Sequence, residues 1–251
     1  MVWSCLVSIL PGMAQTEKLT DYVNPFVGTD GYGNVYPGAQ IPFGGIQISP
    51  DTDSRFYDAA SGYKYNHLTL MGFSLTHLSG TGIPDLGDFL FIPGTGEMKL
   101  EPGTHEDPDQ GYRSRYSHDK EWASPNYYAV ELADYGVKAE MTSGVRSGMF
   151  RFTYPESDNA FIMIDMNHTL WQSCEWSNLR MINDSTITGY KLVKGWGPER
   201  HVYFTATFSK KLTGLRFVQD KKPVIYNTSR FRSSYEAWGK NLMACLSFDT
   251  K

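Results

Sequence analysis

The chain has few cysteines and no strongly basic stretch, and each shortage excludes a class of protein. Its 251 residues include three cysteines, Cys5, Cys174 and Cys245, and no Cys-x-x-Cys pair. This excludes a disulfide framework, a zinc ribbon and a redox dithiol, so we expect Cys174 and Cys245 to be small buried hydrophobic residues. A net charge of −4 without a basic stripe argues against a nucleic-acid partner, because nothing would neutralise phosphates. The pairs Lys210-Lys211 and Lys221-Lys222 are expected in solvated turns.

Long apolar runs are also missing. No stretch beyond the N-terminus approaches the ~20 apolar residues of a membrane helix, so we expect no transmembrane span. The run from Val2 to Leu10, followed by small residues, is typical of the end of a secretory signal peptide cut after Ala14. Residues 1–14 are therefore interpreted as the remnant of such a signal, although its basic start is missing. An ordinary apolar N-terminal segment is the other interpretation.

Helical periodicity is scarce, whereas short strand-like segments between Gly- and Pro-rich turns are frequent from Leu19 onward. The expected strands are Ile46–Ser49, Phe89–Ile92, Tyr127–Leu132, Val137–Thr142, Gly148–Thr153, Phe161–Asp165, Thr186–Leu192 and His201–Phe208. Many short strands of this kind predict an all-β fold, an antiparallel β-sandwich with few short helices. With no repeat and no long linker, the sequence predicts one domain over residues 19–251.

One segment near the C-terminus fits two structures. Ser234–Cys245 is the best candidate for a helix, although Gly239 weakens it. The same residues could instead form a loop that leads into a strand over Leu242–Phe248.

The most informative segment is Gly72–Gly82, which places hydroxyl residues, glycines and His77 among apolar residues. Glycine permits positive φ angles and a close approach of backbone to a ligand. Hydroxyls donate and accept hydrogen bonds, whereas the aspartates that follow, Asp85 and Asp88, only accept. This set suits a ligand with many hydroxyls, such as a sugar. A tight turn between two strands, with His77 satisfying backbone groups, is the alternative.

Four segments in order resemble the N-terminal domain of the family 92 glycoside hydrolases. They are Asp21–Thr29, Tyr36–Gly44, Ser61-Gly62-Tyr63 and Gly72–Gly82, and the similarity runs from about Leu19 to the C-terminus. The resemblance implies a β-sandwich of the galactose-mutarotase-like supersandwich type, truncated before a helical catalytic domain. It also implies a complete protein that is a calcium-dependent, inverting, exo-acting α-mannosidase from a Bacteroidetes-like bacterium.

The resemblance further implies partners and a location. The partners are mannose-containing glycans and a C-terminal helical domain in cis, with calcium bound mainly outside this chain. The expected location is secreted or periplasmic, with outer-membrane association as a further option. We expect residues 1–251 alone to hydrolyse no α-mannoside. The alternative function is a stand-alone carbohydrate-binding or interaction module.

The residues expected to contact substrate follow from the same resemblance. They are Tyr57, Asp58, His77, Ser79, Gly80, Thr81 and Trp196. Aromatic rings such as Tyr57 and Trp196 stack on the apolar faces of sugars. This chain departs from the family at three places. Many family members have tryptophan where this chain has Tyr57, histidine where it has Leu75, and a different pair of residues where it has Ile83-Pro84. We expect His77 to be partly exposed at one end of the sandwich, beside Tyr57 or the Gly28–Asn34 loop.

Glycoside hydrolysis usually requires two carboxylates, but no catalytic acid, base or metal ligand is assigned here. In the family these roles belong to the domain that follows. The clusters Asp51-Thr52-Asp53 and Glu106-Asp107-Pro108-Asp109 lack the spacing of a calcium loop and are expected to be solvated turns.

Overall fold

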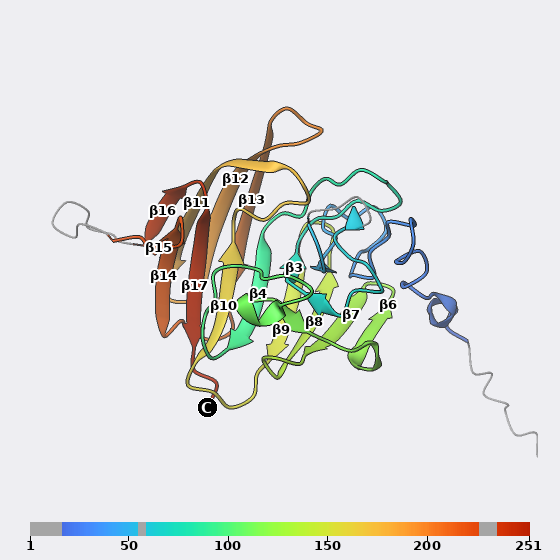
Figure 1. The fold of residues 1–251 in the computed structure, drawn as a ribbon, viewed down its shortest axis with the longest axis horizontal. Helices are drawn as coiled ribbons and strands as arrows, with labels where there is room; N and C mark the ends of the chain where they lie inside the picture. Colours follow the sequence, from blue (N-terminus) through green and yellow to red (C-terminus); the bar gives the residue numbers. More distant parts are fainter. Residues whose placement is uncertain (1–16, 55–58, 226–234) are drawn as a thin grey trace, which may run out of the picture.

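A computed structural model describes residues 17–54, 59–225 and 235–251, and it consists mainly of antiparallel strands (Figure 1). The largest sheet has seven strands in the order β1-β3-β4-β10-β17-β14-β15. These strands are β1 Ser49–Asp51, β3 Gly72–Ser74, β4 Leu90–Thr95, β10 Ala160–Asp165, β14 Gly214–Gln219, β15 Lys222–Pro223 and β17 Leu242–Phe248. Strands that are distant in the sequence, such as β4, β10 and β17, form its centre.

Two four-stranded sheets accompany the large one. The first has the order β6-β7-β8-β9, with β6 Glu121–Ser124, β7 Tyr127–Leu132, β8 Val137–Ser143 and β9 Gly148–Thr153. The second has the order β13-β12-β11-β16, with β11 Ser173–Asn183, β12 Thr186–Lys194, β13 Arg200–Thr207 and β16 Glu236–Gly239. Short elements complete the fold: the pair β2 Thr69–Leu70 and β5 Ser114–Arg115, and the 3-10 turns η1 Leu19–Tyr22, η3 Pro108–Gln110 and η4 His118–Lys120.

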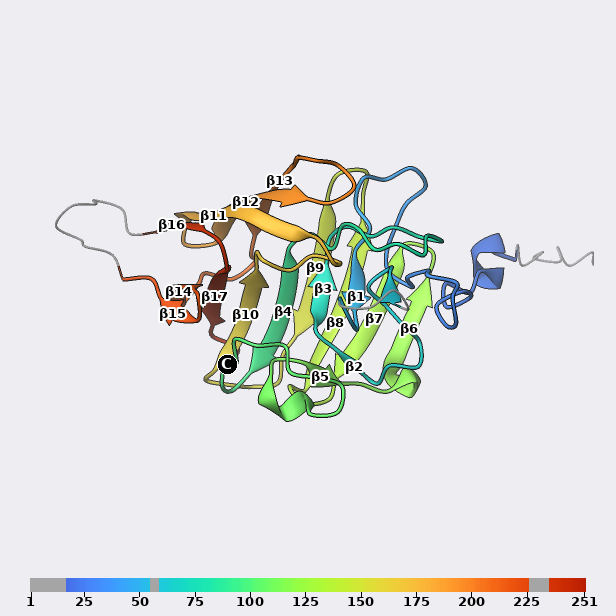
Figure 2. The same cartoon turned by 45° about the horizontal axis from the view of Figure 1, so that its top comes forward.

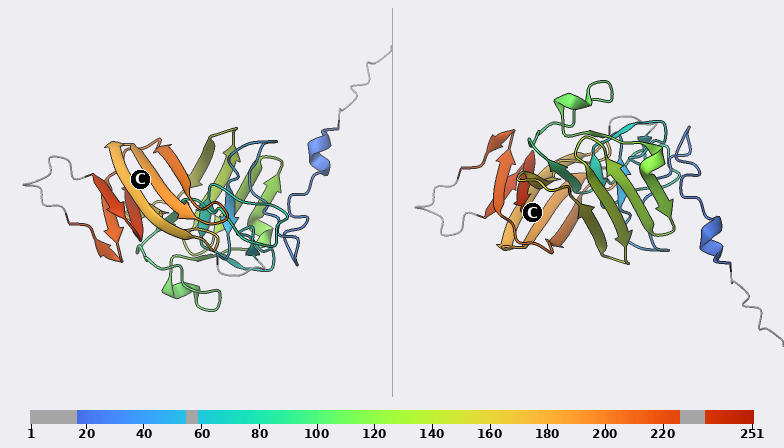
Figure 3. Two further views of the ribbon diagram at one scale, coloured as in Figure 1. Left: turned by 90° about the horizontal axis from the view of Figure 1, so that it is seen from above. Right: turned by 90° about the horizontal axis from the view of Figure 1, so that it is seen from below.

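Both small sheets cover the same face of the large sheet, as Figures 2 and 3 show. Phe73 of β3 and Phe91 of β4 are paired across the large sheet and therefore point to one side. On that side Phe91 packs against Phe150 of β9, with ring centroids 5.2 Å apart, and against Phe204 of β13, at 5.9 Å. Two buried clusters, one under each small sheet, thus join at Phe91 into one core.

The opposite face of the large sheet is covered by a loop. Leu90, Ile92 and Met163 point to this side and are buried. Met98 and Leu100, from the segment between β4 and β5, pack on them. This loop leaves part of the face open, and a cavity lies there. Among the described residues, no helix is long and apolar enough to cross a membrane.

Most predicted strands are confirmed, and the all-β fold is as expected. Seven of the eight expected strands fall on β4, β7, β8, β9, β10, β12 and β13 with small shifts at their ends. The Ile46–Ser49 strand is wrong, because β1 begins at Ser49 and Ile48 only makes a single bridge with Ala39. The longest strand, β11, was not predicted.

The helix expected near the C-terminus is wrong. Glu236–Gly239 and Leu242–Phe248 are the strands β16 and β17, while Ser234 lies outside the described residues. Gly239 has φ of 138°, a backbone conformation that residues with a side chain rarely adopt. This backbone bend is incompatible with a helix and sends the chain from one sheet to the other. Cys174 and Cys245 are buried as predicted, and burial raises the pKa of both thiols.

Candidate functional site

The glycine-rich segment divides into a buried strand and an exposed turn. Gly72–Ser74 form β3 inside the large sheet. Ser79 and Gly80 are exposed, Thr81 is partly exposed, and Gly80 has φ of 75°, a region that glycine adopts easily. The Gly80 amide donates to the carbonyl of Asn34 at 2.7 Å. The turn therefore lies against the Gly28–Asn34 loop, while Tyr57, the other expected neighbour of this segment, lies outside the described residues.

The expectation that His77 is partly exposed is wrong, since only 3% of the residue is accessible. Its Nδ1 donates to the Gln47 carbonyl at 2.7 Å, and its Nε2 donates to Asp51 Oδ1 at 2.7 Å. Both ring nitrogens of His77 are therefore engaged in hydrogen bonds inside the fold. His77 lies inside because the buried polar groups of Asp51 and Gln47 need hydrogen-bond partners there.

Asp51, expected in a solvated turn, is fully buried at the end of β1. Its second oxygen accepts a hydrogen bond from Nε2 of His168 at 2.7 Å. Burial by itself would raise the pKa of Asp51, but His77 and His168 outweigh that effect and hold the pKa well below its usual range. The turn prediction failed because the two histidines lie 26 and 117 positions away in the sequence. Thr52 and Asp53 are buried too, whereas Glu106, Asp107 and Asp109 are exposed as predicted.

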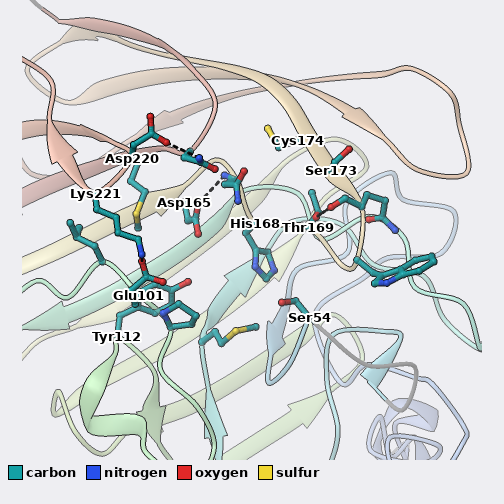
Figure 4. Close-up of a pocket in the computed structure, with 18 residues that line it drawn as sticks. Ser54, Glu101, Tyr112, Asp165, His168, Thr169, Ser173, Cys174, Asp220 and Lys221 are labelled. Carbon is teal, nitrogen blue, oxygen red and sulfur yellow. Dashed lines mark hydrogen bonds and ion pairs between the residues drawn. The ribbon is translucent and has the colours of Figure 1, made fainter.

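His168 connects this network to a cavity of about 710 Å³ on the loop-covered face of the large sheet (Figure 4). Polar groups dominate the part around His168, which includes Ser54, Asp165 and Thr169. Burial raises the pKa of Asp165, against the opposing charge of His168. At the other end, Lys221 pairs with Glu101 at 2.6 Å. Further lining residues are Asn167, Trp171, Gln172, Ser173, Cys174, Asp220 and Asn241.

Asp88 is a second buried carboxylate. Its oxygens face Lys191 Nζ at 3.1 Å, the Thr76 hydroxyl at 2.7 Å and the Arg200 guanidinium. Burial would raise the pKa of Asp88, but the charges of Lys191 and Arg200 lower it overall. Lys191 Nζ also donates to the His168 carbonyl at 2.6 Å, so the two carboxylate networks are joined.

Asp85 fixes the turn that carries Trp196. One Asp85 oxygen accepts from the Leu86 amide at 2.6 Å, and the other accepts from the Trp196 amide at 3.2 Å. Trp196 itself is 61% exposed. The β12–β13 turn is thereby attached to the segment that also carries Ser79, Gly80 and Thr81, and all four residues reach the surface from a shared buried scaffold.

Two predicted site residues cannot be placed, and three residues of the site were not predicted. Tyr57 and Asp58 lie outside the described residues, although Ser54, which lines the cavity, lies close to them in the sequence. Sequence reasoning missed Asp51, His168 and Lys191 as parts of the site. The only signal for them was the unexplained Asp51-Thr52-Asp53 cluster, and no local spacing pointed to its partners.

The described residues do not fit calcium. They contain no group of three or more His, Cys, Asp or Glu side chains arranged to hold a metal ion. The buried carboxylates are committed elsewhere, because Asp51 accepts from two histidines and Asp88 faces Lys191 and Arg200. Calcium needs several free oxygen ligands.

Comparisons with known proteins agree with this architecture. A relative from Arthroderma benhamiae, described as a secreted glycosidase, is 30% identical over 139 residues, which are 55% of this chain and 17% of the relative. The family 92 glycosyl hydrolase CcMan5 superimposes with a TM-score of 0.74 at 26% identity, covering 92% of this chain and 30% of that one. An inverting family 92 mannosidase from Bacteroides thetaiotaomicron shares the fold, with a TM-score of 0.74 at 23% identity over 94% of this chain and 30% of its own.

The chain thus spans less than a third of the length of each of these relatives. Residues 22–251 match the glycosyl hydrolase family 92 N-terminal domain. The chain belongs to that family.

Proposed function

We propose that this chain completes the sugar pocket of an exo-acting α-mannosidase that removes terminal α-linked mannose with inversion. The observation that carries the proposal is an exposed polar turn, Ser79-Gly80-Thr81, held on a buried charged scaffold. The residues on both sides of this turn are fixed by two buried carboxylate networks, through His77 to Asp51 and through Asp88 to Lys191, so the turn is presented in one orientation.

Each residue has a distinct part in this proposal. Ser79 and Thr81 offer hydroxyls, Gly80 allows close backbone approach, and Trp196 offers an exposed ring for stacking on a sugar. Tyr57 and Asp58 are proposed to contribute from the neighbouring segment. His77 acts differently from what the sequence suggested: it is a positioning residue that holds the base of the turn through Asp51.

The chemistry itself is assigned to the remainder of the complete protein. We propose that its C-terminal helical domain supplies the acid and base, binds calcium and packs on residues 19–251. Residues 1–14 are proposed to be the remnant of a signal peptide, and the protein to be secreted or periplasmic, with outer-membrane association as an option. A stand-alone binding module is less favoured, because the matched family consists of glycosyl hydrolase N-terminal domains.

Kinetics of the complete protein test the pocket. Ser79→Ala and Trp196→Ala should each lower kcat/KM on an α-mannobiose about tenfold, and Tm should stay unchanged because both residues are exposed. His77→Ala should lower Tm as well, because it leaves Asp51 without one of its two partners.

Matched controls are available on another sheet. Ser124 and Trp122 of β6 are exposed, so Ser124→Ala and Trp122→Ala should leave kcat/KM unchanged. Wild-type kcat/KM in both Ser79→Ala and Trp196→Ala would show that these residues do not form the pocket.

A further inference from the structure

The outer face of the β13-β12-β11-β16 sheet carries aromatic side chains in a row across all four strands. The register places Tyr203 beside Tyr190, Tyr190 beside Asn178, and Asn178 beside Trp238. Residues directly opposite each other in paired strands point to the same face. Their neighbours Leu179, Gly189 and Ala237 are buried, so the row faces outward, on the side away from the large sheet (Figure 2).

The row is widened by a second set of side chains, two of which are rings. His201, Leu192 and Trp176 lie in register on the next outward positions of β13, β12 and β11. The Tyr190 hydroxyl bonds to His201 Nδ1 at 2.9 Å, and the two rings are within 23° of parallel. The Tyr190 and Tyr203 ring centroids lie 4.9 Å apart. The rings of β12 and β13 thus form one platform, with Trp176 and Trp238 further along.

This face is unusual for the outside of a sheet. Tyr203 is 70% exposed, Trp238 53% and Trp176 47%. The solvent face of an antiparallel sheet normally carries polar residues, and contiguous exposed aromatic rings mark a binding surface.

The charges on the face identify the kind of ligand. The central row is uncharged, and the charged side chains lie around it in balanced numbers: Arg180, Lys194 and Lys240 against Glu175, Glu199 and Glu236. Several are already paired, as in Lys240 with Glu175 at 3.2 Å and His201 with Glu199 at 3.3 Å. An anionic polymer or membrane would find no excess of positive charge here. The face is complementary to an uncharged ligand with apolar faces and many hydroxyls.

We propose that this face is a second glycan-binding surface, on which an uncharged oligosaccharide lies across the strands along the row from Tyr203 to Trp238. Strands are spaced about 4.8 Å apart, so the row extends about 14 Å, which accommodates a short run of linked pyranose rings. Tyr203, Tyr190 and Trp238 stack on the sugars, while the Asn178 side chain sits between them as a polar contact. The surface is separate from the Ser79–Thr81 turn and would hold a glycan near the pocket without processing it.

Retardation of the 251-residue chain in native gels containing soluble α-mannan tests this surface. We expect the wild-type chain to be retarded, and Tyr203→Ala and Trp238→Ala each to weaken the apparent affinity at least tenfold. Trp122→Ala is the matched control, because Trp122 is 46% exposed on a different sheet, and it should bind as the wild type does. Ser124→Ala is a second control and should also bind normally, because Ser124 is exposed on the same strand as Trp122. Circular dichroism of each variant would verify that it folds.

Several results would overturn the proposal. These are no retardation of the wild-type chain, equal loss in Trp122→Ala or Ser124→Ala, or equal retardation by heparin. Self-association that Trp238→Ala abolishes would make a second copy of the chain the occupant. Protection of Trp238 and Tyr203 from hydroxyl-radical labelling in the complete protein would make another part of that protein the occupant.

Discussion

The two small sheets perform the same packing task but place charge in opposite ways. Both cover one face of the large sheet, and both meet at Phe91. In the β13-β12-β11-β16 sheet, called the β11–β13 sheet below, β12 turns Lys191 inward, where the side chain is fully buried against Asp88. In the β6–β9 sheet, β8 turns Glu140 to the outer face, where the exposed Arg151 of the adjacent strand pairs with it and only 6% of Glu140 stays accessible. One sheet therefore has an ion pair inside and aromatic rings outside, and the other has an ion pair on its outer face with an exposed cation.

The difference shows which ion pairs determine how distant segments of the chain are arranged. Glu140 and Arg151 are directly opposite each other in a hairpin, so their pairing follows from local register. Lys191, Asp88 and His168 come from distant segments, and their contacts fix how the β11–β13 sheet sits on the glycine-rich segment. A buried pair loses far more than a surface pair when one partner is removed, because the remaining charge stays desolvated.

The largest effect is expected from removing the buried cation. Lys191→Met keeps most of the apolar stem but removes Nζ, which lies 5.2 Å from the centroid of the Phe89 ring, and leaves Asp88 with one cationic partner, Arg200. We expect the free energy of unfolding, measured in urea, to fall by about 3 kcal/mol. Lys138→Met is the matched control on the other sheet, since Lys138 pairs with Glu140 at 3.5 Å at the surface, and it should change little. Adding Asp88→Asn to Lys191→Met should restore part of the loss. Equal losses in the two single variants would remove the distinction between the sheets.

A smaller effect is expected in the acid unfolding curve. The pKa values of Asp51 and Asp88 are held below their usual range, so both stabilise the fold above pH ~4 and lose that contribution as pH falls through their folded pKa values. Asp165 opposes them, because its pKa is raised. Asp51→Asn should therefore lower stability at pH 7 and flatten its decline between about pH 5 and pH 2. Unfolding can be followed by circular dichroism. If the slope of stability against pH in this range is unchanged in Asp51→Asn, Asp51 does not govern the loss of stability in acid.

The smallest effect is expected from the surface pair. Arg151 and Tyr127 hydrogen-bond to Glu140 and lower its pKa to about 2, but Arg151 is largely exposed. Because water and salt screen such a pair, Arg151→Gln should shift Tm by about 2 °C or less. A shift as large as that of Lys191→Met would mean that the β8–β9 pair is as structural as the buried one.

The sequence predicted strands well where burial repeats locally. Tyr127–Leu132 and Gly148–Thr153 were predicted with correct ends, since alternation and flanking turns are visible in any short window. The missed strand β11 carries a register shift between Cys174 and Trp176, which interrupts the alternation on which the prediction depends. The false helix over Ser234–Cys245 arose because helix-forming residues there are overruled by pairing of β16 with β11 and of β17 with β10.

Only part of the candidate site could be predicted, because some of its residues are adjacent in the chain and others meet only in the folded structure. The exposed turn at Ser79–Thr81 follows from glycines and hydroxyls that are adjacent in the chain. The burial of His77 depends on Asp51 and, through it, on His168, and no local pattern shows that these side chains meet.

By itself, the sequence determined the all-β class, most strand positions, the buried cysteines and the resemblance to family 92, since each rests on composition or on short ordered motifs. Only the tertiary structure decided that Asp51 and His77 are interior, that Lys191 is a buried cation, and that Tyr203, Tyr190 and Trp238 share one outer face. The physical reason is that sheet order and the pairing of buried charges are set by contacts between segments far apart in the chain. Their free energy depends on which partners the whole fold brings within reach.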